Sequence, residues 1–144
     1  MSKIDNIVNG KDNHICIPIA WWRFRDDVYA PWIHGLEKLI QFDKWINGLE
    51  NGIKFEMRHS TQGVEYLDTY IYDVDGELKT KLYSKPSDTH AYLPPTSCHP
   101  YHILKNNPDQ VARRVRKLSN CDIEYNKARK EYSQHLKIRG YSTE

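Results

Sequence analysis

The stretch "VEYLDTYIYDVDGELKTKLYSK", residues 64–85, is the strongest structural signal in this chain of 144 residues. Two alternating runs, rich in tyrosine and β-branched residues, flank Asp75-Gly76. An Asp-Gly pair between such runs marks a β-hairpin, because both residues reach the positive φ angles of a tight turn at low cost. The sequence therefore predicts a two-stranded antiparallel hairpin over residues 64–84. Its core-facing row is either Leu67, Thr69 and Ile71 or the tyrosine row beside it.

Toward the N-terminus, three further elements are predicted. "IKFEM", residues 53–57, alternates like a half-buried strand. Residues 35–50 have the period of an amphipathic helix. "RFRDDVY", residues 23–29, predicts a strand, a tight turn and a strand, and we expect the helix to pack on the same sheet. The apolar side of that helix is predicted to hold Leu36, Leu39, Ile40, Ile46 and Leu49. No structure is predicted for the polar residues 1–14.

Toward the C-terminus, prolines mark a linker and the rest is predicted to be helical. Ser97 can cap a short helix, and Asn107-Pro108 can cap and open the next one, which gives a helix-turn-helix-like segment over residues 97–119. A third helix is predicted after Asp122, ending at Gly140. Strands followed by helices make the predicted fold class α+β.

Composition narrows the class of protein. A hydrophobic content of 39% with 12% aromatic residues is typical of a folded chain the size of one domain. The net charge is +2, but residues 99–144 hold ten basic and five acidic residues, which leaves −3 for residues 1–98. A basic C-terminal third suits a polyanionic partner, although solvated helix faces have the same composition.

Cysteine usage and the N-terminus predict an intracellular protein, in the nucleus or the cytoplasm and not secreted. Cys16, Cys98 and Cys121 are far apart, which favours free thiols in a reducing compartment. The N-terminus lacks the apolar segment of a signal peptide, and no apolar run is long enough to cross a membrane, so no membrane partner is expected. Zinc binding by Cys98, His99 and His102 is less favoured than ordinary capping roles, because no second ligand pair is apparent.

Asp26 and Asp27 stand side by side in an apolar and aromatic run, where adjacent carboxylates repel. Three interactions could offset the repulsion between these carboxylates: neutralisation by Arg23 and Arg25, solvation in a turn, or binding of a divalent cation.

An ordered series of motifs resembles the end of a reverse transcriptase, and it is most similar to the reverse transcriptases of Penelope-like retroelements. The series covers most of the chain: "RFRDDVY", the helix, "IKFEM", "GVEYLDTYIY", "KLYSKPSDTHAYL", "SCHP" and a final "RGY". The resemblance implies an N-terminal remnant over residues 1–22 and a partial palm over 23–85, with an Asp-Asp hairpin and a primer-grip-like hairpin. It implies a linker and a helical, helix-turn-helix-like thumb over 86–144.

The same resemblance implies an RNA-directed DNA polymerase whose catalytic and Mg²⁺-binding residues include Asp26 and Asp27. Two-metal nucleotide addition requires such carboxylates. A reverse transcriptase also needs a palm aspartate on an earlier strand and a fingers domain, whereas Asp5 and Asp12 lie in a polar stretch. The chain is therefore expected to be a fragment, inactive alone, whose partners are a template-primer and the missing palm strands and fingers.

Nucleic-acid contacts are expected from Arg25 in the Asp-Asp hairpin, from the primer-grip-like element and from the basic helix. The candidates are Arg25, Tyr66, Leu67, Arg113, Arg116 and Lys117. Contact with the backbone of a duplex is favoured over base reading. The alternatives are a non-catalytic helix-turn-helix nucleic-acid-binding protein derived from a retroelement, and a remnant without retained function.

Overall fold

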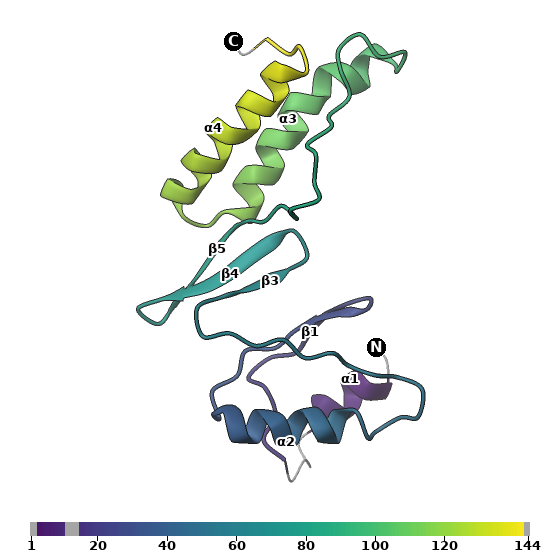
Figure 1. Ribbon diagram of the computed structural model, residues 1–144, viewed down its shortest axis with the longest axis vertical. Coiled ribbons are helices and arrows are strands. Elements are labelled where there is room, and N and C mark those ends of the chain that lie inside the picture. The colour runs from purple at the N-terminus through teal and green to yellow at the C-terminus, as the bar shows by residue number, and fades with distance from the viewer. Residues whose placement is uncertain (1–2, 11–14, 143–144) are drawn as a thin grey trace. The chain divides into compact units, whose positions relative to one another are not determined.

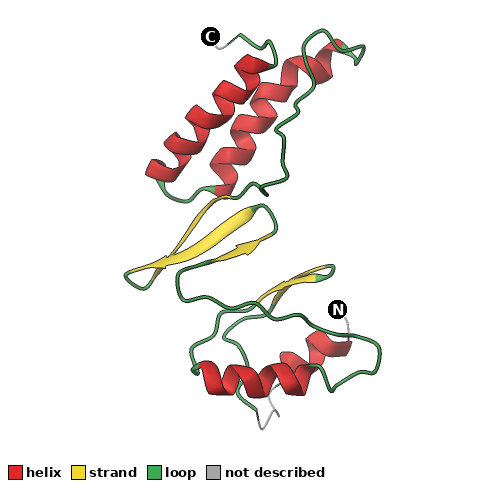
Figure 2. Ribbon diagram, in the orientation of Figure 1, coloured by secondary structure: helices red, strands yellow, loops and turns green. Residues whose placement is uncertain are grey.

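The computed structural model describes residues 3–10 and 15–142 and has the predicted α+β class. Contacts divide the chain into two compact units, Met1–His59 and Ser60–Glu144. Figure 1 and Figure 2 show helices and strands in both units. The palm-like segment 23–85 therefore contributes to both units, whereas the segment 86–144 lies wholly in the second.

The first unit contains helix α1 (Lys3–Val8), strands β1 (Trp22–Phe24) and β2 (Asp27–Tyr29), and helix α2 (Leu36–Ile46). The predicted Asp-Asp hairpin is confirmed. Phe24 pairs with Asp27 in an antiparallel register, so Arg25 and Asp26 form a two-residue turn. Arg25 has a φ of 56°, the positive value that such turns require.

The core of the first unit lies between α1 and α2. Ile4 and Val8 of α1 are buried against Phe42 and Ile46 of α2, with Trp21, Trp32 and Trp45 packed around them. The prediction that α2 packs on the hairpin is wrong, because α1 covers the Phe42 side instead. The predicted apolar side was also wrong in part: Leu36 and Ile40 remain 55% and 48% exposed. Helix α1 was not predicted, because it lies in the predominantly polar stretch of residues 1–14.

A buried carboxylate fastens α1 to the start of the hairpin. Asp5 is only 9% exposed. It accepts a hydrogen bond from Trp21 Nε1 at 3.0 Å and lies 3.4 Å from Arg23 Nη1. Charge-assisted bonds of this kind offset the cost of burying a carboxylate. Arg23 is therefore engaged by Asp5.

The predicted strand at residues 53–57 is not a strand, although its alternation is real. Phe55 and Met57 pack against the first core while Ile53 is 44% exposed. The Asn47 side chain takes the place of a neighbouring strand. Its Oδ1 accepts from the Phe55 N–H at 2.7 Å, and its Nδ2 donates to the Phe55 carbonyl at 3.2 Å. Side-chain bonding therefore satisfies backbone groups that a sheet would otherwise pair.

We expect Asn47→Ala to destabilise the first unit by about 1–2 kcal/mol, because two backbone groups of Phe55 lose their partner. Urea unfolding followed by tryptophan fluorescence measures this unit, since all four tryptophans lie within it. Asn51→Ala, a change at an exposed position nearby, is the control and is expected to be neutral. Equal effects of the two substitutions would contradict the bridging role of Asn47.

The second unit opens with strands β3 (Val64–Tyr66), β4 (Thr69–Val74) and β5 (Glu77–Leu82), which form one antiparallel sheet. The turn at Asp75-Gly76 is confirmed, with φ angles of 54° and 83°. The predicted hairpin has one strand too few, because a second tight turn at Leu67 and Asp68 separates β3 from β4. Leu67 has a φ of 55° and belongs to this turn, not to a core-facing row.

Helices α3 (Tyr101–Leu118) and α4 (Asp122–Ile138) complete the second unit. The two helices predicted within 97–119 are one continuous helix, with Pro108 inside it. Proline removes one intrahelical hydrogen bond. The buried face nevertheless continues past it, from Leu104 to Val111 and Val115. The turn between helices is therefore Ser119–Cys121 and not Asn107–Pro108. The predicted third helix is confirmed, and Gly140 ends it with a φ of 93°.

The second core joins the two helices to the sheet and to the linker. Val111, Val115 and Leu136 are buried, and Leu82 of β5 packs against them. Asn120, between the helices, pairs with the free edge of β5: its N–H donates to Thr80 O at 3.2 Å and its Oδ1 accepts from Thr80 N at 2.8 Å. The sheet and the helical pair are thus one packed body.

Candidate nucleic-acid interface

Helices α3 and α4 lie side by side and run in opposite directions (Figure 1). A three-residue connection, residues 119–121, joins them. DNA-binding helix-turn-helix pairs usually cross steeply, so that one helix can enter a groove, whereas this pair has the arrangement of an αα-hairpin. Its long outer faces, not a protruding helix end, are therefore the surfaces that a nucleic acid can contact.

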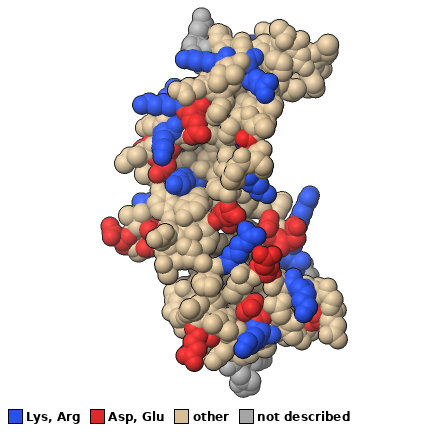
Figure 3. Space-filling view, viewed as in Figure 1, with Lys and Arg blue, Asp and Glu red and all other residues tan. Residues whose placement is uncertain are grey.

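The outer face of α4 is lined by basic, amide and hydroxyl side chains at helical spacing. A shallow depression along it is bordered by Asn126, Arg129, Lys130, Ser133, Gln134 and Lys137. We call these six residues the α4 face. Figure 3 shows lysine and arginine side chains over this part of the second unit, with acidic side chains between them. Within the described part of the chain, Arg129, Lys130 and Lys137 have no ion-pair partner, so their charges are available to an anion. Sequence reasoning missed this face because it sought basic residues on the preceding helix.

The predicted basic residues of α3 are exposed, but they are not equivalent. Arg113 is 84% exposed and has only a 4.0 Å contact with Asp109 one turn earlier. Arg116 donates to Asp122 Oδ1 at 2.7 Å, and its guanidinium lies 4.9 Å from the centre of the Tyr125 ring. Arg116 therefore connects α3 to α4 and is less available to a phosphate than Lys117, which is exposed.

The primer-grip-like turn lies beside α3. Tyr66 ends β3 and Leu67 begins the turn, and Asp68 of that turn pairs with Arg114 at 2.7 Å. The ion pair stands at a small cleft whose other walls come from the end of β5 and the linker. The lining residues are Leu67, Asp68, Tyr83, Ser84, Lys85, Ser87, Asp88 and Arg114. The structure thus brings Tyr66 and Leu67 together with the helical pair, through an arginine that sequence reasoning did not single out.

The Asp-Asp hairpin presents its carboxylates to solvent. Asp26 and Asp27 are exposed, and within residues 3–10 and 15–142 neither makes an ion pair or a side-chain hydrogen bond. Arg25 lies over the Phe24 ring at 5.6 Å instead. Solvation in a turn therefore offsets their mutual repulsion. Mg²⁺ typically takes one or two carboxylates together with waters and substrate phosphates, so the pair fits part of a metal site.

Half-buried tyrosines border the helical pair on the side of the linker. Burial raises the pKa of Tyr92 to about 12, and burial also raises the pKa of Tyr132. The hydroxyl groups of Tyr132 and Ser84 share a hydrogen bond, with 2.7 Å between the two oxygens. Tyr141, from the final "RGY", donates to the Leu93 carbonyl at 2.8 Å. These rings hold the linker against α3 and α4.

We expect the second unit to lose stability between pH 10 and about pH 12 through Tyr92. The pKa of this group is higher in the folded chain, so folding favours the protonated phenol and the contribution is complete below the ordinary value of 10.0. Urea unfolding followed by helical circular dichroism at pH 9, 10 and 11 measures the loss, and Tyr92→Phe should make it shallower. The same pH dependence in both proteins would exclude Tyr92 as its source.

A family model described as an animal helix-turn-helix domain matches residues 91–144. The match spans the end of the linker, α3, the Ser119–Cys121 turn and α4. It supports the helix-turn-helix prediction, and the structure places the turn between α3 and α4. Helix-turn-helix domains are a nucleic-acid-binding class, so the match points to a nucleic-acid partner. No curated protein and no solved structure matches the chain. None of the described helices is both long and apolar enough to cross a membrane.

Proposed function

We propose that this chain binds the backbone of a nucleic-acid duplex through the α4 face, as the thumb part of a retroelement reverse transcriptase. The α4 face carries the proposal. Three cations without an ion-pair partner among residues 3–10 and 15–142, and three neutral hydrogen-bonding side chains, line one side of a 17-residue helix. Phosphate contacts require this combination of positive charge and hydrogen-bond donors.

Backbone contact is favoured over base reading by the arrangement of the helices. In an antiparallel pair, the outer face of α4 can lie along a duplex without inserting a helix end into a groove. An A-form duplex, such as RNA paired with a new DNA strand, has a deep and narrow major groove that side chains do not read. A template-primer is therefore a suitable partner, and Arg113 and Lys117 of α3 are further exposed cations of the second unit.

The origin in a reverse transcriptase is supported by the order of the elements. The Asp-Asp hairpin, the α2 helix, the turn at Tyr66–Leu67 and the helical pair follow one another as in a palm and thumb. The ion pair between Asp68 and Arg114 connects the primer-grip-like turn with a thumb helix, the connection that gripping a primer end would need. In this proposal residues 1–22, 23–85 and 86–144 are a remnant, a partial palm and a linker with thumb.

Within this proposal, Asp26 and Asp27 would hold Mg²⁺ in a complete polymerase, and the bound metal would supply charge stabilisation for nucleotide addition. Arg25, between Phe24 and Asp26, adds a cation beside them. We expect the 144-residue chain alone to show no primer extension on a primed RNA with Mg²⁺, because two exposed carboxylates do not fix two ions. Extension that Asp26→Ala abolishes would contradict this and would show that the chain carries a complete site.

The second candidate is a non-catalytic helix-turn-helix protein, which the family match favours. Competition binding separates the two. A thumb-like surface should bind RNA–DNA duplexes of unrelated sequence with equal affinity, whereas a sequence-reading module should prefer one duplex site strongly. A strong preference that persists at high salt would favour the second candidate.

A further inference from the structure

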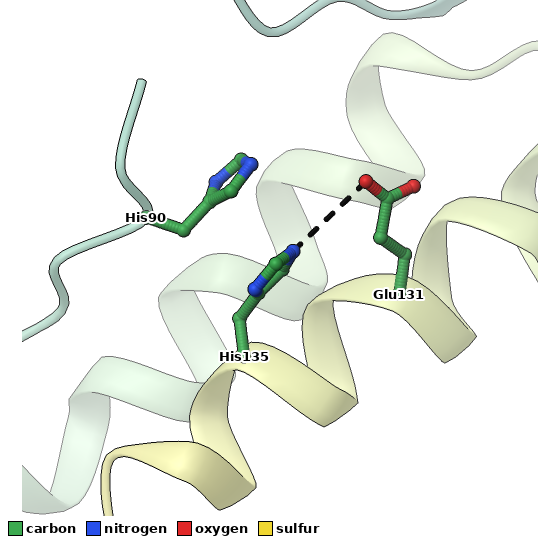
Figure 4. A group of neighbouring side chains, drawn as sticks. All are labelled: His90, Glu131 and His135. Atoms are coloured by element: carbon green, nitrogen blue, oxygen red, sulfur yellow. Dashed lines mark ion pairs between the residues drawn. The ribbon is translucent and has the colours of Figure 1, made fainter. Parts of the chain in front are cut away.

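Three potential metal ligands meet at the linker. His90 comes from the chain between β5 and α3, and Glu131 and His135 occupy consecutive turns of α4. One ligand atom from each lies within 4.8 Å of those of the other two. Figure 4 shows the two imidazole rings and the carboxylate around a common space. The linker and α4 are far apart in the sequence, so only folding creates this cluster.

His90 is held in a strained and incompletely bonded state. Its φ is 49°, in the left-handed region that non-glycine residues seldom adopt. The backbone N–H of His90 donates to Asp88 Oδ1 at 2.9 Å. The imidazole ring of His90 stacks on the ring of His135, with 4.1 Å between the ring centres. The side chain is only 13% exposed, and Nδ1 is buried without a hydrogen-bond partner. The hydrogen-bonding capacity of Nδ1 is therefore unmet, although Asp88 Oδ2 lies 3.6 Å from it.

Two imidazoles and one carboxylate match a known zinc chemistry. Sites with three protein ligands, including two histidines and a glutamate, leave a fourth position for water. Imidazole nitrogens also select zinc-like transition metals over Mg²⁺ or Ca²⁺. In addition, a ligating histidine usually donates its other N–H to a carboxylate. Asp88 Oδ2, 3.6 Å from His90 Nδ1, needs only a small approach to accept that bond.

The distances require the side chains to rotate before all three can contact one ion. His135 Nε2 lies 3.9 Å from Glu131 Oε1. Ligand atoms of a tetrahedral zinc site are about 3.3 Å apart when each bond is about 2.0–2.1 Å. Glu131 is 57% exposed and can turn toward the ion, and the His135 ring can rotate away from its stacked neighbour. Arg114 of α3 is paired with Asp68, which reduces its repulsion of a cation.

We propose that His90, Glu131 and His135 bind one zinc-class divalent ion, which fastens the linker to α4. Metal binding of this type adds directly to folding stability, because the unfolded chain has no preformed site. The ion holds the linker on the side of α4 that carries Glu131 and His135, and so fixes the helix that carries the proposed nucleic-acid surface. The site does not depend on that function, since its ligands are not part of the α4 face.

The test is zinc binding to the full chain by isothermal titration, with melting temperature as a second readout. We expect one ion per chain, a higher melting temperature with zinc, and weaker binding at acidic pH, because protons compete with the metal for its ligands. Co²⁺ in place of zinc should give the visible absorption of a four- or five-coordinate site. Mg²⁺ should produce neither effect.

Substitutions locate the ion. His90→Gln, Glu131→Gln and His135→Gln should each weaken zinc binding at least ~10-fold, as loss of a ligand implies. If a histidine variant fails to fold, zinc binding by Glu131→Gln remains a valid test of the site. Glu131 is exposed and glutamine has nearly the same shape, so this variant should fold. The matched control combines Cys98→Ser, His99→Gln and His102→Gln and should bind zinc normally. No zinc binding, equal binding by Glu131→Gln, or loss of binding in the control would overturn the proposal.

Discussion

Replacing Arg129, Lys130 and Lys137 with alanine is expected to lower the affinity for a nucleic-acid duplex about 100-fold or more at 0.1 M salt. Each phosphate contact contributes close to 0.9 to the slope of log affinity against log salt. Loss of three contacts should therefore flatten that slope by roughly 2 to 3. Preference between sequences should not change, because phosphate contacts carry no sequence information. Fluorescence anisotropy with labelled RNA–DNA duplexes at several salt concentrations measures all three quantities.

The matched control removes the same charge from the other unit. Lys38, Lys44 and Lys54 are exposed residues of the first unit, and their triple alanine variant should keep most of the affinity. Alanine favours helix, so the α4 variant should retain its circular dichroism. A third variant, Arg113→Ala with Lys117→Ala, should have a smaller effect if α4 makes most contacts. Equal losses in the α4 variant and the first-unit variant would show that binding follows total charge and not the α4 face.

Phe42→Ala is expected to destabilise the first unit by about 3–5 kcal/mol, which is comparable to the whole stability of a small unit. Phe42 is 2% exposed and is one of only four buried residues in its cluster, among the residues described. Trp21, Trp32 and Trp45 all contact it through their rings, so no neighbour can fill the cavity without leaving its own position. Tryptophan fluorescence during urea unfolding reports this unit directly.

The same chemical change on the surface provides the control. Phe24 is 54% exposed in β1, and Phe24→Ala should cost less than about 1 kcal/mol. Nucleic-acid affinity should be unaffected by Phe42→Ala, because the core beneath α4 is formed by residues of the second unit. If affinity falls together with the tryptophan transition, binding depends on the first unit, and the α4 face is not sufficient.

Local patterns in the sequence were enough to determine the tight turns at residues 25–26 and 75–76 and the helices α2 and α4. Asp75-Gly76 specified its turn through the low cost of positive φ, and Asp122 and Gly140 marked the beginning and end of α4. The Asp26–Asp27 hairpin was found in the same way. These features depend on residues within a few positions of one another, so one-dimensional spacing carries the information.

Tertiary contacts decided what such patterns leave ambiguous. Burial of Leu104, Val111 and Val115 on one face kept α3 continuous through Pro108, where local chemistry predicted a break. The Asn47 side chain bonds the backbone of Phe55 in the place of a neighbouring strand. Packing of α1 against Phe42 and Ile46 determines which side of α2 is buried. The α4 face and the cluster of His90, Glu131 and His135 could also not be predicted from the sequence. Which helix side remains exposed, and which distant side chains meet, depends on the packing of several elements at once, whereas sequence spacing defines only a single element.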